Sequence, residues 1–78
     1  MRKKELRVIF TFKNTTSAMA MEKLCKEKGM KGRLIPVPRC ITAGCGLSWS
    51  APIEAKEVLI DVMKQYEMNY DQLYELEI

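Results

Sequence analysis

The stretch "GLSWSAPIEAKEVLIDVMKQY", Gly46 to Tyr66, joins a predicted strand directly to a predicted helix. In its first part Leu47, Trp49 and Ala51 alternate with serines, which is the pattern of a half-buried strand. Pro52 suits the first turn of the following helix, because that position needs no amide hydrogen. Along this helix, apolar residues recur at i, i+3, i+4, i+7, i+8 and i+11, the spacing of one helical face. These residues are Ala55, Val58, Leu59, Val62, Met63 and Tyr66.

The first part of the chain repeats this order of strand and helix. The segment "LRVIFTF", Leu6 to Phe12, is β-branched and aromatic on both faces, as an inner strand is. The segment "KNTTS" then offers N-cap residues for a helix. The candidates are Asn14, Thr15 and Thr16.

The first helix has a predicted core face and a predicted end. Its apolar residues share one side of the helix, and we expect Cys25 to be core filler there. The face consists of Ala18, Met21, Leu24 and Cys25. Gly29 is expected just after the helix, with Met30 next to it in contact with Cys25, as in a Schellman motif.

Two further strands complete the pattern. "GRLIPV" is short, and Pro36 and Pro38 place it at an edge or end it early, because proline cannot donate to a ladder. The last stretch, "QLYELEI", alternates, with Tyr74, Leu76 and Ile78 on one face and Glu75 and Glu77 on the other. The order β-α-β-β-α-β over residues 1–78 predicts one α+β domain. It would be a ferredoxin-like sandwich, a four-stranded antiparallel sheet with two helices on one face.

The composition excludes several classes of protein. The 78 residues are 47% hydrophobic and 29% charged, an ordinary globular mixture. The net charge of +3 and the scattered basic residues do not indicate nucleic-acid binding. RNA-recognition modules share this strand order, but the strand around Trp49 lacks their paired aromatic residues. No apolar run could span a membrane and the N-terminus does not resemble a signal peptide, so we expect a cytoplasmic protein.

The chain has three cysteines and no histidine. An odd number of cysteines is unlike a secreted disulfide scaffold. The absence of histidine removes Cys/His zinc sites and the Ser/His and Cys/His catalytic pairs. Three cysteines, one of them on a helical core face, do not complete a four-ligand zinc site, so no metal is expected.

The loop in "PVPRCITAGCGLSW", residues 36–49, carries the chemistry and is predicted to be the exposed tip of a hairpin. A cysteine acts as a nucleophile only as thiolate, which needs exposure and a positive charge nearby. Cys45 is flanked by Gly44 and Gly46, and Arg39 lies in the same loop. The glycines allow a positive φ, so amide groups could face a bound sulfur or anion. From these residues alone, a reactive thiol and a plain turn remain equally open.

Cys40 has alternatives of its own. It could pair with Cys45 as a redox dithiol, act as a resolving thiol, or be incidental in the loop. The C-x₄-C spacing differs from the C-x₂-C of thioredoxin-like motifs, which favours an incidental or resolving residue over a stable disulfide.

With the loop in view, the chain resembles the selenium/sulfur carrier protein-like family, a family of small bacterial domains. The resemblance covers nearly the whole chain. Its most specific element is the segment Pro36–Arg39, followed after five residues by Cys45 and Gly46. Ala43 and Gly44 depart from the family pattern, which has small hydroxylated residues there, and Cys40 is not part of that pattern. The other matching features are Phe12 at the end of the first strand, Ala18-Met19, Glu22-Lys23-Leu24, Gly29 and "CGLSW".

The resemblance implies that Cys45 carries sulfur or selenium as a persulfide or perselenide. Donor and acceptor proteins would be its partners, and the transfer would need no cofactor, metal or general base. Arg39 would stabilise the thiolate, while Gly44 and Gly46 would give access to it. The chain would then be a carrier that docks with proteins, and not an enzyme that turns over a free substrate.

Two other functions stay open on the sequence. One is a thiol redox switch between Cys40 and Cys45. The other is an interaction or ligand-sensing module whose cysteines are inert. A homodimer is a further expectation, because the apolar "VIFTF" strand would otherwise leave an apolar sheet face uncovered.

Overall fold

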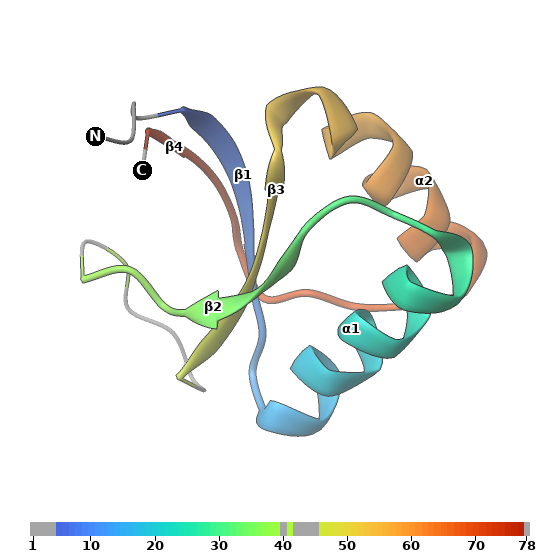
Figure 1. The fold of residues 1–78 in the computed structure, drawn as a ribbon. Coiled ribbons are helices and arrows are strands. Elements are labelled where there is room, and N and C mark those ends of the chain that lie inside the picture. The colour runs from blue at the N-terminus through green and yellow to red at the C-terminus, as the bar shows by residue number, and fades with distance from the viewer. Residues whose placement is uncertain (1–4, 40, 42–45, 78) are drawn as a thin grey trace.

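In the computed structural model, which describes residues 5–39, 41 and 46–77, one antiparallel sheet is covered by helices on a single face (Figure 1). The strand order across the sheet is β2-β3-β1-β4, and every neighbouring pair is antiparallel. The predicted ferredoxin-like α+β fold is confirmed. Its elements are β1 Leu6–Thr11, α1 Thr15–Lys28, β2 Arg33–Pro36, β3 Leu47–Pro52, a 3₁₀ turn Ile53–Ala55, α2 Lys56–Gln65 and β4 Leu73–Glu77.

The core lies between the helices and the two central strands. Phe10 of β1 stands opposite Trp49 of β3, and both side chains are buried. Cys25 is buried among the same residues, so its prediction as core filler is confirmed. The cluster comprises Val8, Phe10, Phe12, Ala18, Met21, Cys25, Trp49, Ala51, Ala55, Leu59 and Met63.

Both ends of α1 form as the sequence predicts. The side chain of Asn14 caps the helix, since its Oδ1 accepts a hydrogen bond from the Ser17 amide at 2.8 Å. Gly29 has a φ of 66°, and the Met30 amide donates to the Cys25 carbonyl at 2.8 Å. The Gly29 amide donates to Lys26, which completes the Schellman motif.

The apolar stripe of α2 is narrower than predicted. Leu59 and Met63 are buried, but Val58 is 52% exposed and Tyr66 is 46% exposed. The helix ends at Gln65, so Tyr66 lies beyond its last turn, where the Lys28 ammonium sits 4.8 Å from the ring centre. Val58 lies about 100° around the helix from Leu59, on the flank of the buried stripe.

Pro52 closes β3 and caps the 3₁₀ turn, so it precedes the helix and does not start it. The last strand alternates as predicted, with Tyr74 and Leu76 half-buried and Glu75 and Glu77 exposed. Ile78 lies outside the described residues.

The helix-free face of the sheet has a buried centre. Ile9 alternates with Val8 and so faces away from the helices, yet it is 0% exposed within a single chain. Ser50, beside it, is also buried, and its Oγ accepts a hydrogen bond from Arg7 Nε at 2.7 Å. The centre of this face therefore leaves no apolar surface open, and the homodimer expected from the apolar strand stays a prediction.

Gly32 is required where β2 approaches Trp49. Its φ is 124°, and a Cβ built there would lie 2.6 Å from the indole Nε1. We therefore expect Gly32→Ala to lower the free energy of unfolding by about 1–4 kcal/mol, from backbone strain and steric overlap. Urea unfolding followed by the fluorescence of Trp49 measures this change.

Gly46 provides the matched control for that experiment. A Cβ there would meet no atom within 4 Å, and its φ is outside the left-handed region. Gly46→Ala should change the free energy of unfolding by less than about 0.5 kcal/mol. Equal losses in the two variants would contradict the role assigned to Gly32.

Candidate functional site

The cysteine loop is closed at its base by the last residues of the hairpin. Pro36 pairs with Leu47, and the Val37 amide donates to the Gly46 carbonyl at 3.0 Å. Cys40, Gly44 and Cys45 lie outside the described residues, so their predicted roles stay predictions.

The two described site residues, Arg39 and Gly46, lie on opposite arms of the loop, and both are exposed. Within the described part of the chain, no carboxylate lies within ion-pair distance of Arg39. At Gly46 the positive φ that glycine allows is not used. The open space around its Cα is consistent with the predicted role of this glycine in giving access.

The strand register brings the loop to the end of the sheet where α1 begins. Thr11, the last residue of β1, pairs with Ser48, two residues after Gly46. The start of β4 is fixed at the same end, because the Asp71 amide donates to the Thr11 carbonyl at 2.7 Å. The Gln72 amide also donates to Thr11 Oγ1 at 3.0 Å. Thr11 therefore links three chain segments that are far apart in the sequence.

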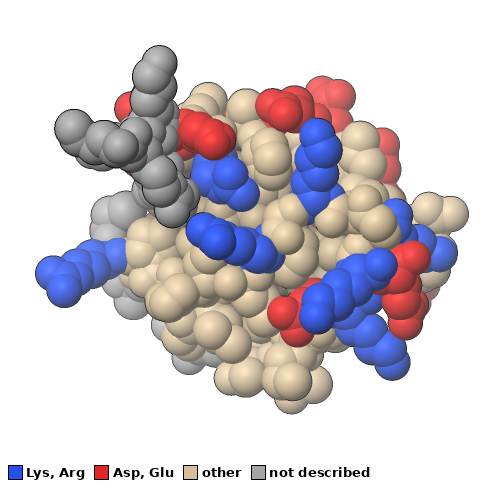
Figure 2. Space-filling model, viewed as in Figure 1, with Lys and Arg blue, Asp and Glu red and all other residues tan. Residues whose placement is uncertain are grey.

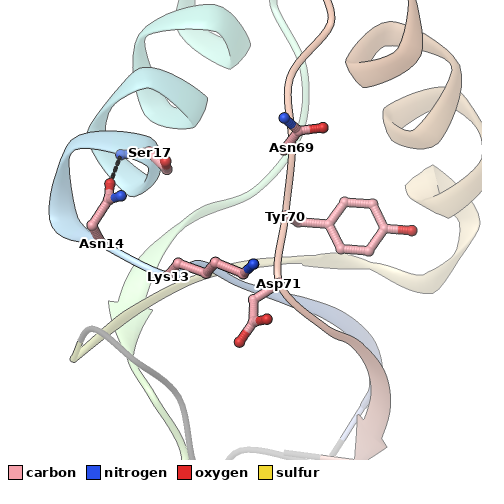
Figure 3. Close-up of a pocket in the computed structure, with 6 residues that line it drawn as sticks. All are labelled: Lys13, Asn14, Ser17, Asn69, Tyr70 and Asp71. Atoms are coloured by element: carbon pink, nitrogen blue, oxygen red, sulfur yellow. Dashed lines mark hydrogen bonds between the residues drawn. The ribbon is translucent and has the colours of Figure 1, made fainter.

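A polar cavity of about 360 Å³ opens at this end of the sheet (Figure 3). It lies between the start of α1 and the segment that leads into β4. The side chain of Lys13 extends toward that segment, and within the described residues it forms no ion pair with Asp71. The lining residues are Lys13, Asn14, Ser17, Asn69, Tyr70 and Asp71.

The sequence predicts an N-cap in "KNTTS", and Asn14 is that N-cap. It does not point to Asn69, Tyr70 or Asp71. The hydrogen bond from its amide to the Thr11 carbonyl holds Asp71 at the cavity, and Tyr70 is held there by its packing. The Tyr70 ring stacks edge-on against Phe10, with centroids 5.1 Å apart. Only the pairing of β4 with β1 could have revealed these residues.

Cys25 is chemically distinct from a carrier thiol. It is buried, and burial raises its pKa to about 11. At neutral pH only on the order of one such thiol in ten thousand is ionised. Since the thiolate is the nucleophile, Cys25 is inert in the folded protein.

The charges on the visible surface do not form a patch of one sign. On the face shown in Figure 2, basic side chains are interspersed with acidic ones. Over the described residues, no group of three or more cysteine, aspartate or glutamate side chains is placed to hold a metal ion. None of the helices in this part of the chain is long and apolar enough to cross a membrane.

Comparison with known families gives one match. The family model described as "Putative Se/S carrier protein-like" matches residues 7–75, from β1 to β4 and including the whole cysteine loop. The chain belongs to this family. No curated protein and no solved structure matches the chain. All three cysteines lie within the region matched to the Se/S carrier-like family.

The burial of Cys25 in this Se/S carrier-like domain predicts its reactivity. We expect iodoacetamide at pH 8 to leave Cys25 unmodified in the folded protein and to modify it after unfolding in urea. Peptide mapping by mass spectrometry measures both states. Modification of Cys25 in the folded state would contradict the buried position.

The raised pKa also predicts a pH dependence of stability. Above pH 9 the thiol of Cys25 ionises in the unfolded chain but stays protonated in the folded one, which favours unfolding. Between the ordinary pKa of 9.0 and about 11, the wild type should lose up to about 2–3 kcal/mol relative to Cys25→Ala. Urea unfolding of both proteins across this range gives the difference.

Proposed function

We propose that this domain carries sulfur or selenium as a persulfide or perselenide on Cys45 and passes it to a partner protein. The observation that supports this function best is the family match across the whole cysteine loop. Arg39, which is exposed and forms no ion pair with the residues that the structure describes, adds to it, because a carrier thiol needs a positive charge nearby.

The transfer is an exchange between thiols and needs no cofactor. The Cys45 thiolate attacks the terminal sulfur of a donor persulfide, and the donor leaves as a thiolate. One S–S bond breaks and one forms, so the step involves no net oxidation. The acceptor thiolate then repeats the reaction on the Cys45 persulfide. The selenium reaction has the same balance with selenium as the transferred atom.

The other residues of the chain fit a carrier role for Cys45 alone. Cys25 is excluded as the carrier by its burial and its raised pKa. The chain has no histidine, and thiolate exchange needs no imidazole base. Donor and acceptor proteins are the partners that this chemistry requires.

The proposal is tested by the mass of the intact protein after incubation with a persulfide donor. We expect the wild type to gain the mass of one sulfur atom, and the gain to disappear after treatment with a reductant. Cys45→Ser should show no gain, because its hydroxyl cannot form a persulfide. A gain that persists in Cys45→Ser would overturn the assignment.

Two further variants separate the carrier from its alternatives. Cys25→Ala should still gain the sulfur, since Cys25 is buried. Cys40→Ser should also gain it if Cys45 works alone. Mild oxidation gives a second readout, because a dithiol switch would lose two thiols within one chain. If Cys40→Ser shows neither this loss nor the gain of sulfur, the protein is a dithiol switch.

The role of Arg39 is tested through the ionisation of Cys45. Arg39→Gln should raise the pKa of the Cys45 thiol by up to about one unit, because it removes a positive charge from the loop. The pH dependence of the alkylation rate measures this shift. Arg33→Gln is the matched control, as it removes an equally exposed charge from β2, outside the loop. A pKa shift of the same size in both variants would assign the effect to net charge.

A further inference from the structure

The helix-free face of the sheet is covered although no helix lies on it. Ile9, Ser48 and Ser50 all point to this face, and each is at most 2% exposed. The segment that follows β2 leaves the sheet on the side opposite the helices (Figure 1). This segment holds the first residues of the cysteine loop, which therefore lie on the side where the covered residues are.

Ile41 is the buried residue among those of this loop that the structure describes. It is 7% exposed, whereas Arg39 and Gly46 are exposed and Val37 and Pro38 are half-buried. Its amide donates to the Pro38 carbonyl at 2.9 Å, which fixes Ile41 relative to the start of the loop. The described part of the loop thus has one side turned to the protein and one turned to water.

Ile41 is not part of the helix-side core. The buried cluster under the helices contains neither Ile41 nor Ile9, although both are buried. Ile41 and Ile9 are therefore buried outside that cluster, one in the loop and one on the helix-free face.

We propose that Ile41 anchors the cysteine loop to the helix-free face of the sheet, with its side chain over Ile9 and the serines of β3. Its chemical role is that of a positioning residue. Four residues separate it from Cys45, so the anchor limits where the thiol can lie. The anchor itself stands independently of carrier activity, whereas its effect on sulfur transfer rests on the proposed function.

The experiment compares Ile41→Ala with Ile60→Ala. Ile60 is a half-buried isoleucine that packs against the helix-side core, so its truncation removes the same atoms away from the loop. Hydrogen exchange of the Val37 and Ile41 amides reports the state of the loop, since both form hydrogen bonds there. We expect the exchange rates of these two amides to be roughly tenfold higher in Ile41→Ala than in Ile60→Ala.

The alkylation of Cys45 gives a second readout, in a Cys40→Ser background so that one loop thiol remains. With Ile41→Ala, the pH midpoint of alkylation should move toward that of a free thiol, about 8.5. Ile41→Val, which keeps most of the side chain, should restore both the midpoint and the slow exchange.

Equal exchange and equal pH midpoints in Ile41→Ala and Ile60→Ala would overturn the anchor. If Ile41→Ala does not fold, Ile41→Val is compared with Ile60→Val by the same two measurements. The persulfide experiment remains separate, because loosening of the loop without any Cys45-dependent mass gain would support the anchor and contradict the carrier.

Discussion

The antiparallel register of β1 on β3, with Phe10 opposite Trp49, is the constraint on which the rest of the structure depends. A shift of one residue would exchange the two faces of either strand and move the aromatic pair out of the core. The same register places Ile9 beside Ser50 on the opposite face. It therefore defines two buried regions at once, a large one under the helices and a small one on the other side. Gly32 shows how tightly the large one is packed, because no side chain fits between its backbone and the indole of Trp49.

This register also determines which parts of the chain meet at the end of the sheet that carries the loop. β1 leaves the sheet there, β3 enters it, and Thr11 holds the segment before β4 through backbone and side-chain hydrogen bonds. The base of the cysteine loop, the start of α1 and the polar cavity therefore share one end of the sheet. The positive end of the α1 dipole lies there too, and no acidic residue in its first turn offsets it.

The features that the sequence predicts correctly depend on local chemistry. Gly29 marks the end of α1 because only a residue that accepts a positive φ can close a Schellman motif there. Cys25 is recognised as core by its place on a helical face. The features it misses depend on contacts between distant segments. Val58 and Tyr66 fit the helical period but lie on the flank and beyond the end of α2, because the sheet covers only a narrow stripe. The burial of Ile41 has no periodic signal, since a loop has no repeating geometry.

The contrast between two cysteines connects the fold to the proposed chemistry. A thiol in the core, as Cys25 shows, is protected at the cost of its reactivity, because burial holds it in the protonated form. A thiol on an unrestrained loop would ionise more readily, but its persulfide would be open to any thiol in solution. A carrier needs the intermediate condition, in which the thiol is accessible to a docked partner and restrained in position. The anchor proposed at Ile41, in a loop closed at its base by Val37 and Gly46, would restrain Cys45 in this way. On this proposal the sheet has two roles, since one face forms the core with the helices and the other holds Ile41 of the loop.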